Sequence, residues 1–254
     1  MSRDASGYYP IPEVGPEVKF PSVTTILGCV HNWFDQWKVD LCVDWLYEQT
    51  VRPFLAGELP IEQLREMDMV KVLDDAKLHH KDTSGEAKDF GSRFHAAMDA
   101  YHHNDGEYSV DSDLIPYMDA AIDWENLVML KVIESEHMVF SRQYQYAGTL
   151  DVYAEARFND DLPPIKGVLD FKVRNGKDGK RIPVYQTDRM QVAAYVMAQE
   201  EMTGHLLDYG GIVIVNREQK RVEPHIYMRP QLIGAGMEFL ALNEYFKITK
   251  RRVK

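Results

Sequence analysis

Apolar residues at three- and four-residue steps dominate the first half of the chain and predict helices there. The expected helices cover residues 33–50, 61–78, 113–131 and a segment that starts after 82–84 and ends near 104–106. Hydroxyl side chains at Ser22, Thr24 and Thr25 stand at the start of a short apolar run, where they are placed to cap another helix. Residues 1–20 lack such a period and are expected to form an extended arm.

Short runs of β-branched and aromatic residues replace this period after residue 131 and predict strands. The runs cover residues 138–140, 149–154, 168–173, 211–215 and 222–228, and further helices are expected at 186–202 and 231–250. This order of elements is typical of an α/β or α+β protein. We interpret the chain as one domain over residues 1–254, with a helical part at 21–131, a sheet-containing core at 132–228 and a C-terminal helix with a basic tail at 229–254.

The composition narrows the function classes. The chain has 29 lysines and arginines against 40 acidic residues, a net charge of −11, which argues against a free-standing basic nucleic-acid binder. Only Cys29 and Cys42 are present, so a disulfide framework and a four-cysteine zinc or iron–sulfur site are excluded. The sequence has no targeting peptide, no apolar run of membrane-spanning length and no P-loop, so we expect a cytoplasmic protein without an ATP motor.

One segment of the chain concentrates residues with catalytic chemistry. Asp170 and Lys172 are two apart on one expected strand, so both point to the same face, where an uncompensated charged pair is costly. A hairpin between the strands brings Asp151 beside Asp170. Two adjacent carboxylates favour a divalent cation, and oxygen ligands suit Mg²⁺ or Mn²⁺. Gln191 and Tyr195 lie one turn apart on the next expected helix.

These residues form three motifs, Gly148-x-x-Asp151, Asp170-x-Lys172 and Gln191-x-x-x-Tyr195. In this order and spacing the sequence resembles the PD-(D/E)XK nuclease superfamily, in particular its RecB-like exonuclease branch. Upstream, Gly91-Ser92-Arg93-Phe94-His95 looks like the histidine motif of that branch, and the segment 20–27 is similar to the opening motif of mitochondrial genome maintenance exonuclease and related phage exonucleases. The resemblance implies an α/β fold with a central mixed sheet flanked by helices, and a helical N-terminal part that shapes a substrate channel.

The resemblance also implies roles for individual side chains. The implied metal ligands are Asp151, Asp170 and His95, with Glu136 as a weaker candidate that the neighbouring Glu134 rivals. The implied groups around the reaction are Lys172, which would orient the attacking water or stabilise the phosphorane, and Gln191 and Tyr195, which would position the substrate backbone and the lysine. Structural explanations compete with these roles, since Asp170 and Lys172 alone also suit a surface ion pair, and His95 a half-buried histidine beside Asp99.

Contacts with DNA are expected at two places in the chain. The candidate residues are Ser22, Thr24, Arg174 and Arg189. Residues 166–189 hold seven basic and three acidic side chains, and clustered basic side chains attract phosphates. The hydroxyls before the first helix are caps or phosphate contacts, and the resemblance favours DNA. Tyr8 and Tyr9 on the arm are candidates for stacking on bases, whereas the histidine doublet at 102–103 is expected to be a solvated helix end.

The sequence therefore predicts a Mg²⁺- or Mn²⁺-dependent DNA exonuclease that prefers single-stranded ends and acts in recombination, repair or replication, in a phage context. One alternative is a double-strand or structure-specific nuclease of the same superfamily. Another is a non-catalytic DNA-binding recombination partner with a degenerate nuclease fold. A recombination or single-strand-binding protein is a candidate partner, and the oligomeric state is left open.

Overall fold

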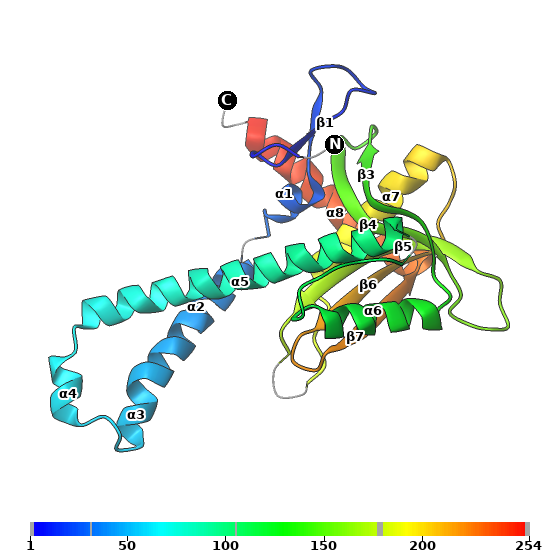
Figure 1. The fold of residues 1–254 in the computed structure, drawn as a ribbon. Coiled ribbons are helices and arrows are strands. Elements are labelled where there is room, and N and C mark those ends of the chain that lie inside the picture. The colour runs from blue at the N-terminus through cyan, green and yellow to red at the C-terminus, as the bar shows by residue number, and fades with distance from the viewer. Residues whose placement is uncertain (1–2, 31, 105, 177–179, 252–254) are drawn as a thin grey trace. The chain divides into compact units, whose positions relative to one another are not determined.

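The computed structural model describes residues 3–30, 32–104, 106–176 and 180–251, and these form two units. The first unit joins Met1–Cys29 to Gly91–Lys254 and contains the sheet (Figure 1). The second unit, Val30–Phe90, is helical. The boundary between them falls inside one long helix, α5 (Met69–His103), so that His95 belongs to the unit that holds the sheet.

A five-stranded mixed sheet forms the centre of the first unit. Its strands are β3 (Lys131–Ser141), β4 (Tyr146–Ala156), β5 (Ile165–Arg174), β6 (Tyr209–Asn216) and β7 (Arg221–Met228), in the spatial order β3-β4-β5-β6-β7. Neighbouring strands are antiparallel except β5 and β6, which are parallel. Because a parallel pair needs a crossover, helix α7 (Gln186–Thr203) connects them. The expected α/β class with a mixed sheet flanked by helices is confirmed.

Helices cover both faces of this sheet (Figure 1). Helices α7 and α8 (Arg229–Arg251) pack on one face, and α6 (Ile115–Leu127) lies on the other. A Cβ at Gly210 of β6 would come within 2.5 Å of Val192 and 2.8 Å of Leu232, so the glycine lets α7 and α8 approach the strand closely. All of β6 is buried, as expected of a strand that is covered on both faces.

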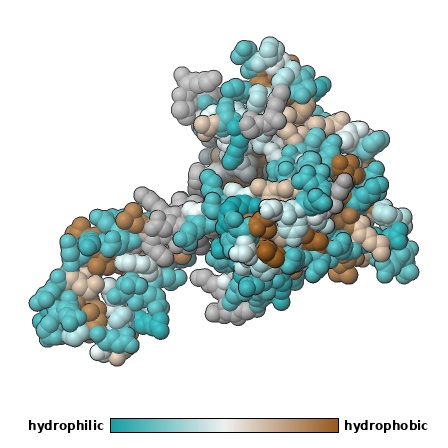
Figure 2. Space-filling model, viewed as in Figure 1, coloured by the Kyte–Doolittle hydropathy of each residue, from teal (hydrophilic) through white to brown (hydrophobic). Residues whose placement is uncertain are grey.

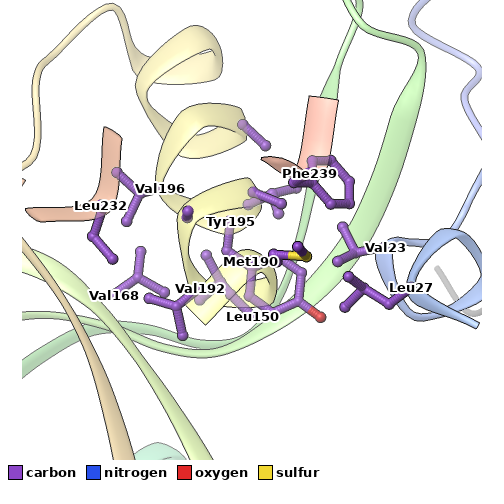
Figure 3. Close-up of a cluster of buried hydrophobic side chains, with 14 of the residues drawn as sticks. Val23, Leu27, Leu150, Val168, Met190, Val192, Tyr195, Val196, Leu232 and Phe239 are labelled. Atoms are coloured by element: carbon purple, nitrogen blue, oxygen red, sulfur yellow. The ribbon is translucent and has the colours of Figure 1, made fainter. Parts of the chain in front are cut away.

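The main core lies between the sheet and helices α7, α8 and α1 (Val23–Leu27), and Figure 3 shows its side chains. The labelled members are Val23, Leu27, Leu150, Val168, Met190, Val192, Tyr195, Val196, Leu232 and Phe239. Burying one such side chain contributes about 1.5–3 kcal/mol to folding. Leu150 immediately precedes Asp151, so this core fixes the part of β4 that carries the candidate metal ligand.

The N-terminal segment is attached to the sheet. Strands β1 (Tyr8–Pro10) and β2 (Lys19–Pro21) form a short antiparallel hairpin inside the expected extended arm. Ser22 then forms a bridge with Ala147 of β4. Its hydroxyl accepts the N–H of Thr25, so the predicted helix cap is confirmed at Ser22.

Tyr9 of β1 is part of the core. Its ring is buried, and its hydroxyl lies 2.9 Å from the Thr149 hydroxyl at hydrogen-bond distance. The expectation that Tyr9 stacks on bases is therefore wrong, because alternation along β1 turns this side chain to the sheet. Tyr8 is half-buried and packs against the main core.

Replacing Ser22 with alanine is expected to lower the free energy of unfolding by about 1 kcal/mol, because the first turn of α1 loses its cap. The Ser22 hydroxyl accepts the Thr25 N–H at 3.0 Å and donates to Thr25 Oγ1 at 2.7 Å. Urea unfolding measures the change. Thr24→Ala is the matched control, since this exposed hydroxyl accepts from Arg3 and lies 3.0 Å from the Ser22 hydroxyl but accepts no helix N–H, so its loss should cost less than about 0.5 kcal/mol. Equal stability of Ser22→Ala and the wild type would contradict the role of the hydroxyl.

Helix α5 differs from the sequence expectation. A helix was expected to end at residue 78 and a new one to start after 82–84, but α5 continues through both positions. The separate helix α4 (Ile61–Glu66) ends earlier than predicted. Asp, Thr and Ser inside a helix each cost about 0.5 kcal/mol relative to Ala, which a helix that is propagated from both sides tolerates. The cap predicted at 82–84 is therefore wrong.

The second unit consists of helices. They are α2 (Asn32–Leu46), a π-helical turn η1 (Tyr47–Val51), α3 (Arg52–Leu55), α4 and the first part of α5. The helix expected at 33–50 is thus confirmed in position. Figure 2 shows apolar surface on the visible face of this unit. Within the described part of the chain, no helix combines the length and apolarity that crossing a membrane requires.

Candidate metal centre

Three carboxylates lie in a row across β3, β4 and β5. The register pairs Val152 of β4 with the residue before Glu136 on one side and with the residue before Asp170 on the other. Both pairs of strands are antiparallel, so Asp151 stands next to Glu136 and to Asp170. The backbone N–H of Phe171 donates to Asp151 Oδ2 at 2.6 Å, which fixes that carboxylate between the strands. The predicted meeting of Asp151 and Asp170 is therefore found.

His95 reaches this row from helix α5. Its Nδ1 lies 3.4 Å from Asp151 Oδ2 and 3.8 Å from Glu136 Oε1. The ring of Phe94, one residue earlier, packs edge-on against Phe171 with centroids 5.8 Å apart. This contact holds α5 against β5 and so positions the imidazole. One donor atom each from His95, Glu136 and Asp151 lie within 4.8 Å of one another.

The structure distinguishes the two glutamates that the sequence left open. Glu136 joins His95 and Asp151, whereas Glu134 Oε2 lies 3.2 Å from His137 Nε2 in a separate contact. The backbone at Glu136 has φ 45°, in the left-handed region that costs a non-glycine residue roughly 1–3 kcal/mol. A left-handed backbone conformation persists only where surrounding contacts hold it, and here it occurs at Glu136, a member of the candidate metal-binding group.

Asp170 and Lys172 form the other end of the row. Lys172 Nζ lies 2.6 Å from Asp170 Oδ2, and Asp170 is only 1% exposed. The contact is close but lacks hydrogen-bond geometry, and among the described residues this oxygen has no hydrogen-bond partner. The Lys172 ammonium therefore compensates the charge of this buried carboxylate, and the oxygen, which accepts no aligned hydrogen bond, keeps lone pairs that can bind a further cation.

The charges of these groups depend strongly on one another. Burial opposes a charged imidazole, but the Asp151 carboxylate outweighs it and raises the pKa of His95 to about 9. Burial, reinforced by Asp151, raises the pKa of Glu136 to about 7. Burial also raises the pKa of Asp170 to about 6, against the influence of Lys172. For Lys172, burial is outweighed by Asp170 and Asp151, and its pKa is raised.

These residues fit a divalent cation. Carboxylate oxygens with one imidazole nitrogen suit Mg²⁺ or Mn²⁺ better than a soft metal that prefers thiolates. The three donor atoms of His95, Glu136 and Asp151 are already gathered, and the pairing of β4 with β5 holds Asp170 next to Asp151. A cation would replace protons at His95 and Glu136, since ligands bind metals in their deprotonated forms.

Gln191 and Tyr195, the residues of the third motif, lie one turn apart on helix α7. The Gln191 side-chain amide donates to the Tyr195 hydroxyl at 3.0 Å. Tyr195 is buried, which raises its pKa well above the ordinary value. A Cβ at Gly148 would come within 2.5 Å of Tyr195 Cε1, so the glycine of the first motif makes room for the tyrosine of the third. The structure thus brings all three motifs together.

The residues expected to bind DNA have different surroundings. Arg174 donates to both oxygens of Asp188, at 2.7 and 2.8 Å, and its guanidinium lies 4.3 Å from the Tyr185 ring centroid. Arg189 is exposed on α7. Ser22 is buried and caps α1, as described above, and Thr24 is exposed. Contact of these four residues with DNA stays a prediction.

Asp188 is an important residue that the sequence interpretation missed. It is buried at the first turn of α7, binds Arg174 and accepts the backbone N–H of Tyr185 at 2.8 Å. An acidic residue three positions after the helix start is a known sign of such reciprocal capping. That signal is present in the sequence, whereas its pairing with Arg174 depends on the packing of β5 against α7.

Known proteins show only limited similarity to this chain in sequence and structure. No protein-family model matches the chain, and no curated protein matches its sequence. A solved structure described as SSO0001 is 13% identical with a TM-score of 0.28, and the match covers 50% of this chain and 58% of that one. The alkaline exonuclease LHK-Exo from Laribacter hongkongensis is also 13% identical with a TM-score of 0.28, and its match covers 64% of this chain and 86% of that one.

Proposed function

We propose that the chain is a divalent-metal-dependent nuclease of the PD-(D/E)XK type that hydrolyses phosphodiester bonds in DNA, with exonuclease action on single-stranded ends. The observation that carries the proposal is the row of Glu136, Asp151 and Asp170, with His95 against Glu136 and Asp151 and Lys172 against Asp170. Carboxylates, a histidine and a lysine in this order provide both a cation site and a fixed positive charge beside it.

The chemistry follows from what each group holds. A bound Mg²⁺ or Mn²⁺ supplies positive charge for the phosphate oxygens and lowers the pKa of water. The Lys172 ammonium is kept charged by Asp170 and Asp151. It can therefore orient the attacking water in line with the phosphorus or stabilise the negative charge that develops on the phosphorane. Gln191 keeps the Tyr195 hydroxyl in place behind the lysine strand.

DNA is the proposed substrate because basic residues cluster along the chain around Lys172. The exposed residues Lys180, Arg181 and Arg189 belong to the basic segment 166–189, which contains Lys172. Arg174 donates to Asp188, so in this proposal it holds the first turn of α7 in place. It adds to the positive electrostatic potential near the site but does not bind a phosphate through two hydrogen bonds. A salt-sensitive grip on the phosphate backbone is expected.

End-labelled DNA tests the proposal. Single-stranded, blunt double-stranded and circular DNA are incubated with the protein with and without Mg²⁺, and we expect the linear single strand to be degraded from an end only when metal is present. Faster loss of the blunt duplex would favour the double-strand alternative, and cutting of circles would indicate endonuclease action. No degradation with Mg²⁺ or Mn²⁺ would contradict the proposal and favour the non-catalytic DNA-binding alternative, possible partners of which include recombination proteins.

Metal binding is expected to stabilise the protein. At a Mn²⁺ concentration of a hundred times Kd, the added free energy is about 2.7 kcal/mol, which raises Tm by about 5–10 °C. In Asp151→Asn the amide oxygen can still accept the Phe171 N–H, but the ligand charge is lost, so the Tm rise should disappear. Asp161→Asn, which changes an exposed loop carboxylate, is the matched control and should respond to Mn²⁺ as the wild type does. Thermal unfolding followed by circular dichroism measures both.

A further inference from the structure

A polar cluster joins the two elements that bring His95 and Glu136 together. Asp99 lies one turn after His95 on α5, and Ser135 immediately precedes Glu136 on β3. The Ser135 hydroxyl donates a short hydrogen bond to Asp99 Oδ1. His103 Nδ1 lies 3.0 Å from the same carboxylate oxygen and 3.3 Å from the Ser135 hydroxyl.

This cluster is too exposed to matter much for folding. The Asp99 side chain is 34% exposed and the His103 side chain 61% exposed. Polar pairs that water reaches contribute little to stability, since water replaces the lost partner. The main core that holds the sheet lies elsewhere, between β4, α1, α7 and α8.

The same cluster is well placed to control the metal site. A metal centre needs its donor atoms held to within roughly 0.5 Å, and partners of the ligand-bearing elements provide that precision. Glu136 needs such support because its backbone has φ 45°, a conformation that neighbouring contacts must hold. The bond from Ser135 to Asp99 acts one residue away from Glu136 and one helical turn away from His95.

We infer that Asp99 and Ser135 are positioning residues that set the separation of His95 from Glu136, with His103 orienting the Asp99 carboxylate. The inference rests on the proposed function, since it concerns ligands of the proposed metal centre. Neither residue is part of the ligand set, and Asp99 entered the sequence interpretation only as a possible partner of His95. In the structure Asp99 bonds to Ser135 and His103.

Mn²⁺ affinity of the protein without DNA tests this inference, with free Mn²⁺ measured by electron paramagnetic resonance. Ser135→Ala is the informative variant, because serine is neutral and its removal changes no charge near the cation. We expect about tenfold weaker Mn²⁺ binding, the lower end of what loss of a partner of a metal ligand costs, with an unchanged urea midpoint of the metal-free protein. Ser135→Thr keeps the hydroxyl and should restore the affinity.

Ser141→Ala is the matched control on the same strand. The Ser141 hydroxyl donates to Glu201 Oε2 at 2.5 Å, so it also links β3 to a helix by a serine–carboxylate bond, but away from the metal site. Ser141 is fully buried, and its loss should lower the urea midpoint and leave the Mn²⁺ affinity unchanged.

The outcomes separate the inference from the proposed function. Wild-type affinity in Ser135→Ala would overturn the inference while leaving the metal centre in place. A fall in Mn²⁺ affinity that comes with a lower urea midpoint of the metal-free protein would also overturn it, because a structural role of Ser135 explains that result. A fall in affinity that Ser135→Thr does not restore would overturn it as well. Absence of Mn²⁺ binding by the wild-type protein would overturn the proposed metal centre and this inference with it.

Discussion

Lys172→Ala is expected to lower the rate of DNA hydrolysis about a thousandfold while the protein stays folded, because one preorganised charge is lost at the reacting phosphate. Lys172 Nζ lies 2.6 Å from Asp170 Oδ2 and is kept protonated by the carboxylates around it. The lysine side chain is 23% exposed, so water can enter the space that alanine leaves and solvate Asp170. Single-turnover degradation of labelled DNA in Mg²⁺ measures the loss, and circular dichroism verifies the fold.

Lys166→Ala is the matched control for this prediction. Lys166 lies on the same strand, is exposed, and pairs with Glu155 at 3.4 Å across the strand edge. Exposed pairs of this kind contribute about 0–1 kcal/mol, so the variant should be as stable as the wild type. Its rate at saturating DNA should be nearly that of the wild type, because the loss of a basic residue from segment 166–189 weakens DNA binding rather than the chemical step. If Lys172→Ala retained most of the wild-type rate, the lysine would have no part in the reaction and the proposed mechanism would fail.

Gly148→Ala is expected to lower the free energy of unfolding by about 1–3 kcal/mol, because it forces a methyl group into a filled space. The new Cβ would stand 2.5 Å from Tyr195 Cε1, and Tyr195 is 3% exposed with its hydroxyl held by Gln191. The ring has to move, and the hydrogen bond to Gln191 moves with it. We therefore expect a loss of DNA hydrolysis beyond the loss of stability, measured at a temperature where the variant remains folded.

Gly234→Ala provides the opposite result with the same chemical change. Gly234 lies in α8, and a Cβ there meets nothing within 4 Å. Alanine is the better helix former, so this variant should be about 0.5–1 kcal/mol more stable than the wild type. Urea unfolding of both variants makes the comparison. A Gly148→Ala protein as stable as the wild type would show that the tyrosine has room to shift.

Much of the sheet and of the site could be predicted from local patterns. The apolar run 211–215 is buried on both faces as β6, and Asp170 and Lys172 share a face because side chains alternate along a strand. The meeting of Asp151 and Asp170 follows from hairpin pairing of neighbouring strands. These predictions succeed because the period of a strand and the order of strands leave few alternatives.

Other features depend on contacts that a local pattern does not contain. His102 was expected to be solvated, yet its side chain is 3% exposed and its Nε2 lies 2.9 Å from Glu125 Oε1. Only the packing of α6 against α5 places that carboxylate there. Glu134 and Glu136 are equivalent in sequence, and the difference between them arises from strand pairing, which sets Glu134 opposite Tyr153 and Glu136 next to Asp151, and from the positive φ at Glu136.

That irregular stretch of β3 also bears on whether a strand of another protein can pair with the edge of the sheet. β3 is an outer strand of the described sheet, and a regular outer strand presents a continuous row of backbone donors and acceptors on which a foreign strand can add. The register shift between Val132 and Glu134 interrupts this row near the start of β3, and the left-handed backbone at Glu136 interrupts it near the middle. We therefore expect the local distortion at the candidate metal centre to hinder the addition of a foreign strand at this sheet edge as well.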